Sequence, residues 1–96
     1  MKNFVISYDL NGPNPTHAKM DAHLKACPFC VNYGRLLETV WYFRGNTSTN
    51  DLFNYVSKIL SQNDRLLVVE GAEATFNNLL IDDQAIVNAW NNRRAA

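Results

Sequence analysis

The residue of this chain best placed for chemistry is Asp9, which ends an apolar stretch that begins at Phe4. Residues 11–15 hold one glycine and two prolines, a combination that extends neither a strand nor a helix. A carboxylate where an apolar strand meets a loop is a common place for chemistry. Mg²⁺ keeps several waters and typically takes one or two carboxylates plus phosphate oxygens. Asp9 is therefore either a magnesium ligand or a turn-capping residue that accepts from backbone amides two residues on.

Five further polar residues are candidates to surround Asp9 and bind substrate: Tyr8, Asn11, Thr39, Arg35 and Arg44. A guanidinium group binds phosphate through a planar fork of donors, which makes the two arginines candidate phosphate contacts. The alternative for each of these residues is a solvated position at the edge of a strand.

The cysteine pair Cys27-Pro28-Phe29-Cys30 has the C-x-x-C spacing of redox sites. A thioredoxin-like site needs this motif at a helix N-terminus, where the dipole lowers the thiol pKa. Here the motif follows the end of a predicted helix. A structural zinc needs four ligands, and His17 and His23 share no obvious face with both thiols. Two buried, inert thiols are the preferred interpretation, and half a zinc site completed across a dimer is the alternative.

The elements that would position these residues follow from hydrophobic patterns. Alternation places Phe4, Ile6 and Tyr8 on one face of a strand over 4–9, and Val5, Ser7 and Asp9 on the other. Apolar residues on both faces indicate a central strand. A helix is expected from an N-cap at Thr16 to about Ala26, where Pro28 stops it.

The rest of the chain continues the alternation of strand and helix. Residues 35–44 form either one bent strand or two strands that break near Glu38 and Thr39. A helix follows Ser48, and a strand covers 65–70. A short edge strand near 79–81 is possible. A last helix begins at Asp82 or Asp83 and carries Ile86, Ala89 and Trp90, with Arg93 and Arg94 at its C-terminus.

The order β-α-β-β-α-β plus a C-terminal helix predicts one ferredoxin-like α/β sandwich over 1–96, an α+β fold with a mostly antiparallel sheet. The first two helices can cover only one face of the sheet. Val5, Leu67 and Val69 then need a cover, which is either the C-terminal helix or a second copy of the chain.

Charge and hydropathy narrow the possible partners. Nine Lys plus Arg balance nine Asp plus Glu, so an extended duplex-binding surface is disfavoured while a local patch stays possible. No apolar run approaches the roughly 18 residues of a membrane span, which argues against a membrane partner. The N-terminus does not have the pattern of a signal peptide, so we expect a reducing, cytoplasmic setting.

Three motifs resemble the SinR-like branch of the small CRISPR-associated endoribonuclease family, whose members act in spacer acquisition. They are Ser7-Tyr8-Asp9-Leu10-Asn11, Glu38-Thr39-Val40-Trp41, and Asn63-Asp64-Arg65-Leu66-Leu67-Val68-Val69. The similarity spans residues 3–71, and the order and spacing of the motifs are more specific than any one of them. This resemblance implies a ferredoxin-like homodimer in which Asp9 faces its symmetry mate and the pair holds a divalent metal, such as magnesium, for phosphodiester hydrolysis.

The sequence is compatible with three functions. The first is a magnesium-dependent endonuclease, an endoribonuclease or endodeoxyribonuclease, in which Asp9 is both catalytic residue and metal ligand. The second is a non-catalytic scaffold or adaptor dimer associated with nucleic acid. The third is a toxin–antitoxin-type interaction module. The position of Asp9 favours the nuclease, and the neutral charge favours the other two.

Overall fold

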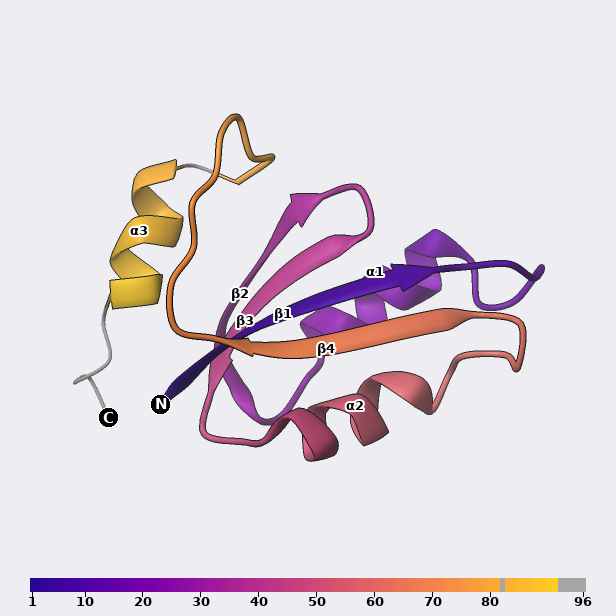
Figure 1. The fold of residues 1–96 in the computed structure, drawn as a ribbon. Coiled ribbons are helices and arrows are strands. Elements are labelled where there is room, and N and C mark those ends of the chain that lie inside the picture. Colours follow the sequence, from indigo (N-terminus) through magenta and orange to yellow (C-terminus); the bar gives the residue numbers. More distant parts are fainter. Residues whose placement is uncertain (82, 92–96) are drawn as a thin grey trace.

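The computed structural model of the chain describes residues 1–81 and 83–91. Its elements, shown in Figure 1, are β1 Lys2–Asp9, α1 His17–Lys25, β2 Cys30–Leu37, β3 Val40–Gly45, α2 Thr49–Ser57, β4 Arg65–Gly71 and α3 Asp83–Asn91. The expected order of strands and helices is confirmed, and the fold is a mixed α+β one. The expectations for Asp82, Arg93 and Arg94 lie outside the described residues.

The four strands form one antiparallel sheet in the order β2-β3-β1-β4. β1 is central, and its Ile6 pairs with Trp41 of β3 on one side and with Val68 of β4 on the other. The segment 35–44 is a hairpin that turns at Glu38 and Thr39, so the two-strand alternative is correct. Its first strand begins at Cys30, earlier than the expected Arg35.

The helix starts follow local capping chemistry. The hydroxyl of Thr16 accepts from the Lys19 amide at 3.2 Å. Ser48 does the same for the amide of Asp51 at 3.1 Å, so both predicted N-caps are confirmed. The possible edge strand at 79–81 is not formed. A single backbone bond of 3.0 Å from Leu80 to the carbonyl of Leu36 is found there instead.

The main core lies between α1, α2 and the first face of the sheet. Trp41 is buried there. The side chains that meet in this core come from β1, β3 and the two helices: Phe4, Ile6, Tyr8, Trp41, Phe43, Met20, Leu24, Leu52 and Val56. Burial of these large apolar groups is the main driving force for the fold.

The second face of the sheet is covered in part by the chain's own C-terminal segment. Residues 72–81 leave β4 and lead to α3, which Figure 1 shows set apart from α1 and α2. Ile86 and Trp90 of α3 pack with Leu36 and Tyr42 in a second, smaller cluster. We call residues 72–81 and α3 together the roof. The C-terminal helix thus covers the part of the second face that contains Leu36 and Tyr42.

Hydrogen bonds and one close approach fix the roof to the sheet. The Asn3 side-chain amide donates to the Trp90 carbonyl at 2.8 Å, and the Tyr42 hydroxyl donates to Asn3 Oδ1 at 2.7 Å. The Trp90 indole N–H donates to the Ala72 carbonyl at 3.2 Å. A Cβ on Gly71 would lie 2.7 Å from the same ring, so glycine permits this contact. The roof is therefore a specifically packed part of the fold.

The roof does not reach the β4 edge of the second face. Leu67 is 59% exposed and Val69 is 43% exposed. Both lie opposite β1 residues of this face, since Leu67 pairs with Ser7 and Val69 with Val5. Of the three residues expected to need a cover, Val5 therefore packs beneath the roof, whereas Leu67 and Val69 stay exposed. Among the described residues no helix has the length and apolar character needed to cross a bilayer.

Candidate functional site

Asp9 stands at the end of β1, directly opposite Arg65, the first residue of β4. One carboxylate oxygen lies 3.8 Å from a guanidinium nitrogen of Arg65, and the two side chains are 62% and 78% exposed. A shallow cleft of about 170 Å³ adjoins them, with Ser7 and Leu67 in its lining. In this exposed position water screens the pair, so both charges stay available to a ligand.

Thr39 is the predicted neighbour that the structure places beside this site. Its carbonyl in the β2–β3 turn accepts the backbone N–H of Tyr8 at 3.1 Å, which brings the turn to the end of β1. Ser7 pairs with Val40, so the turn and Asp9 lie at the same end of the sheet.

Asn11 lies close in sequence to Asp9, but its hydrogen bonds hold a loop. Its backbone N–H donates to Asp64 at 2.7 Å, and its side-chain amide donates to the Asn63 carbonyl at 3.0 Å. The backbone amides of Asn11 and Ser61 hold the pKa of the Asp64 carboxyl below its usual range. These bonds tie the chain after β1 to the turn before β4, and so help to fix the spacing of Asp9 and Arg65.

Tyr8 and Arg35 meet on the opposite face of the sheet from Asp9. Tyr8 is 2% exposed within the main core, and burial raises its pKa. Arg35 forms an ion pair with Asp21 of α1, which raises the pKa of the guanidinium. Its charge also lies 5.1 Å from the centre of the Trp41 ring. These two predicted site residues are thus brought together, but the sheet separates them from Asp9.

Arg44 lies at the other end of the sheet from Asp9. It pairs with Asn3, and the six residue steps along β1 from Asn3 to Asp9 span about 20 Å. Its guanidinium donates to Asn32 Oδ1 at 3.1 Å, and the residue is only 5% exposed. The structure therefore gives Arg44 an interior hydrogen-bonding position rather than one beside Asp9.

Arg65 is the cation at this site that sequence reasoning missed. Antiparallel pairing alone does not fix which residues face each other, because the first residue of β3, Val40, pairs with Ser7, whereas the first residue of β4, Arg65, pairs with Asp9. The contact between Arg65 and Asp9 follows from the register of β4 on β1, which the sequence pattern does not indicate.

A metal at Asp9 would need ligands from outside one chain. Among residues 1–81 and 83–91, no group of three His, Cys, Asp or Glu side chains gathers as a metal site. Mg²⁺ can be held by two carboxylates with water and phosphate completing its coordination. The donor set thus fits magnesium when water and phosphate oxygens, or the Asp9 of a second copy, complete the coordination.

The two thiols form a separate cluster between α1 and β2. Their sulfur atoms lie 3.1 Å apart, with Cys27 buried and Cys30 partly buried. Burial, and next the neighbouring Cys27 thiol, raise the pKa of Cys30. Raised thiol pKa disfavours the reactive thiolate, as expected for inert thiols. His23 is held elsewhere, donating to the Tyr55 carbonyl at 2.7 Å and stacking on the Tyr55 ring.

No family model matches the chain, and no curated protein matches it significantly.

Proposed function

We propose that the chain works as a homodimer that hydrolyses phosphodiester bonds in RNA or DNA, with Asp9 of both copies binding magnesium or another divalent cation. The proposal includes a ferredoxin-like fold and membership of the SinR-like branch described above. The strand order β2-β3-β1-β4, with all neighbours antiparallel, supports the fold assignment.

The observation that carries this proposal is the shared position of Asp9 and an exposed apolar edge. Leu67 and Val69 lie on the same sheet face as Asp9 and remain 59% and 43% exposed. Exposed apolar groups that lie together mark an interaction surface. In a two-fold dimer each surface meets its own copy, so packing about an axis near β4 brings two Asp9 carboxylates together.

Hydrolysis would then depend on the two Asp9 carboxylates, the cation between them and the guanidinium of Arg65. Two adjacent carboxylates repel each other unless a cation binds between them. The bound cation supplies charge neutralisation at the phosphate and an activated water for attack. Arg65, 3.8 Å from Asp9, is placed to bind a non-bridging phosphate oxygen. Its flexible, exposed side chain can leave Asp9 when substrate enters.

A non-catalytic nucleic-acid scaffold is the second candidate. The balance of nine basic and nine acidic residues favours it, as does the single carboxylate per chain at this site. In that case the same dimer surface and Arg65 serve binding alone. An interaction module of the toxin–antitoxin type has the same dimer surface but does not require nucleic acid.

The test is a panel of RNA and DNA substrates incubated with Mg²⁺ and with EDTA. Asp9→Asn is expected to lower magnesium-dependent cleavage by at least about 100-fold, because it removes the charge that holds the cation. Glu73→Gln, a change at an exposed carboxylate of the roof, is the matched control and should cleave as wild type. Cleavage that survives Asp9→Asn contradicts the proposal. Binding without cleavage supports the scaffold, and no binding at all leaves the interaction module.

The dimer is tested by sedimentation of wild type and Leu67→Glu. In a dimer the new carboxylate would be buried without an opposite charge, which is unfavourable. Leu67→Glu should therefore be monomeric and should also lose cleavage. Val31→Glu is the control, since Val31 is 56% exposed on the opposite edge strand. Wild type that stays monomeric at high concentration excludes a site made of two Asp9 residues.

A further inference from the structure

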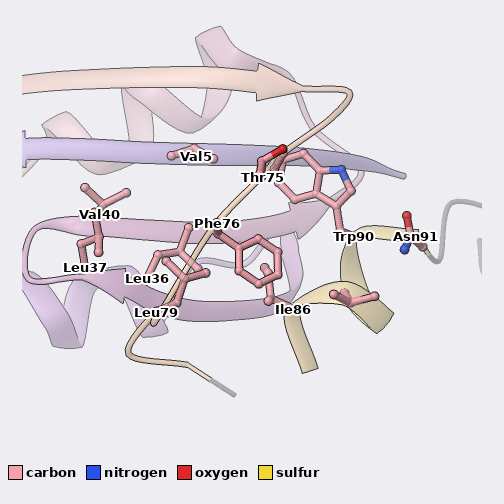
Figure 2. A pocket seen from close by; sticks show the side chains of 12 residues that line it. Val5, Leu36, Leu37, Val40, Thr75, Phe76, Leu79, Ile86, Trp90 and Asn91 are labelled. Atoms are coloured by element: carbon pink, nitrogen blue, oxygen red, sulfur yellow. The ribbon is translucent and has the colours of Figure 1, made fainter. Parts of the chain in front are cut away.

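A cavity of about 270 Å³ lies between the second face of the sheet and the roof. Figure 2 shows its floor, to which Val5, Leu36 and Val40 contribute, and its opposite wall, which contains Phe76, Ile86 and Trp90. None of the twelve residues that line it carries a charge, and only Thr75 and Asn91 add a hydroxyl or an amide group.

The walls of this cavity are held at several points around it. Trp90 is fixed through its carbonyl to Asn3 at 2.8 Å and through its indole N–H to Ala72 at 3.2 Å. The other side of the roof is fixed by the 3.0 Å bond from Leu80 to the Leu36 carbonyl. Closing the cavity would break these bonds, so the space persists although its apolar lining forgoes packing contacts.

We propose that this cavity is a binding site for a small, uncharged aromatic molecule of one or two rings. Its size sets the upper limit, because an apolar cavity of about 150 Å³ already holds benzene, and the volume here is about 270 Å³. The aromatic rings of Phe76 and Trp90 offer faces and edges on which a flat ring packs.

The lining also excludes charged ligands. An ionised group in this cavity would lose its hydration and find no opposite charge among the lining residues. One polar atom on the ligand can be satisfied, by the hydroxyl of Thr75 or the amide of Asn91. The expected class is therefore a neutral bicyclic or monocyclic compound with at most one hydrogen-bonding group.

This site is independent of the proposed nuclease site. β1 contributes Val5 to the cavity and Asp9 to the other site, and the four residue steps between these positions span about 13 Å. Neither site uses the side chains of the other, so the failure of one proposal does not decide the other.

The experiment titrates indole into the ¹⁵N-labelled chain and follows amide chemical shifts. Indole is neutral, has two fused rings and carries one donor. We expect saturable shifts around the cavity lining, with a dissociation constant on the order of 0.1–1 mM. Indole-3-carboxylate, which is ionised at neutral pH, should bind at least about 10-fold more weakly.

Two variants test the location. Val40→Phe and Val5→Phe each place a ring in the cavity from a different strand, and either should abolish saturable binding in a chain that still folds. Val31→Phe is the matched control, because it adds the same ring at an exposed position of the edge strand β2 that does not line the cavity. Indole that gives no saturable shifts, or that binds both cavity-filling variants as it binds wild type, overturns the proposal.

Discussion

Asp9 and Arg65 face each other across the β1–β4 ladder, with 3.8 Å between carboxylate oxygen and guanidinium nitrogen. Both side chains are largely exposed, so in water this pair adds little to stability, about 0–1 kcal/mol. The pair matters because it lies at the end of the sheet where Leu67 is exposed and no other element among the described residues covers the sheet face. Substitutions there should change what the surface binds and leave the fold almost unaltered.

The first prediction concerns Arg65→Gln. If Arg65 contacts phosphate, this change should weaken binding of all sequences alike and reduce the slope of log K against log salt by about one per chain. The free energy of unfolding should change by less than about 0.5 kcal/mol, because the side chain is 78% exposed. Labelled oligonucleotides at several salt concentrations, with urea unfolding alongside, measure both effects.

The control for this prediction is Lys2→Gln. Lys2 forms a similar exposed pair with Glu70 at 3.7 Å, but at the other end of the sheet. The Lys2→Gln variant should keep the wild-type slope of log K against log salt. An unchanged slope in Arg65→Gln would show that this guanidinium contacts no phosphate.

Local patterns were sufficient to predict most of the elements. The alternation of Phe4, Ile6 and Tyr8 defines β1 and its buried face, and it already separates Tyr8 from Asp9. Thr16 and Ser48 begin helices because each hydroxyl accepts an amide three residues on, a purely local bond. Such features depend on neighbours in sequence and can be recognised without the fold.

The contacts that complete the second face could not be predicted in this way. Asn3 reaches the carbonyl of Trp90, 87 residues further along the chain. No spacing in the sequence indicates that Trp90 packs on Gly71 or that Arg35 pairs with Asp21. The candidate site was only partly predicted for the same reason, because the strand register places Arg44 at the far end of the sheet from Asp9 and Arg65 directly opposite Asp9.

The second prediction compares two glycines beneath the roof. In Gly71→Ala the new methyl would lie 2.7 Å from the rigid Trp90 ring, so α3 must shift. This overpacking should cost about 1–3 kcal/mol. In Gly34→Ala the methyl meets only the end of the Ile81 side chain, which can rotate away. Urea unfolding of both variants should show a clearly larger loss for Gly71→Ala, and a larger loss for Gly34→Ala would mean that Trp90 is not seated as described.

The third prediction concerns the thiol pair. Burial and the Cys27 thiol raise the pKa of Cys30, so little thiolate forms near pH 8. Iodoacetamide should therefore modify Cys30 at least about 10-fold more slowly in the native chain than in urea. Peptide mass spectrometry over time measures the rate. Cys27→Ala removes the smaller of the two causes that raise the Cys30 pKa, which is the neighbouring thiol. Alkylation of Cys30 should therefore be faster in this variant than in wild type, but still slower than in the unfolded chain.

Nearly equal rates in the native and unfolded chain would contradict this picture of a protected thiol. Such rates would indicate instead that the thiols of the C-x-x-C pair are reactive in the folded chain.

The fourth prediction is a loss of stability at alkaline pH caused by Tyr42. Burial raises the pKa of its hydroxyl to about 12, and that hydroxyl donates to Asn3 at 2.7 Å. Above its ordinary pKa of about 10, the unfolded chain releases this proton while the folded chain retains it. Stability that is fully present below about pH 10 is therefore lost progressively toward about pH 12, by up to about 2–3 kcal/mol.

Tyr42→Phe separates this effect from general alkaline denaturation. At neutral pH it should cost about 1–2 kcal/mol, because Asn3 Oδ1 loses its buried donor. Between about pH 10 and 12 it should lose less stability than wild type, since the titrating group is gone. Part of the alkaline loss should remain, because burial also raises the pKa of Tyr8 and Tyr55.

The measurement is urea unfolding of both proteins at intervals from about pH 8 to about pH 12. Tyr33→Phe is the matched control, because it removes a hydroxyl from a ring that is 46% exposed and should follow the wild-type curve. Parallel curves for wild type and Tyr42→Phe would mean that Tyr42 ionises equally well in the folded chain. The roof would then be too loosely packed to bury it, and the hydrogen bonds from Tyr42 to Asn3 and from Asn3 to Trp90 could not be what holds α3 on the sheet.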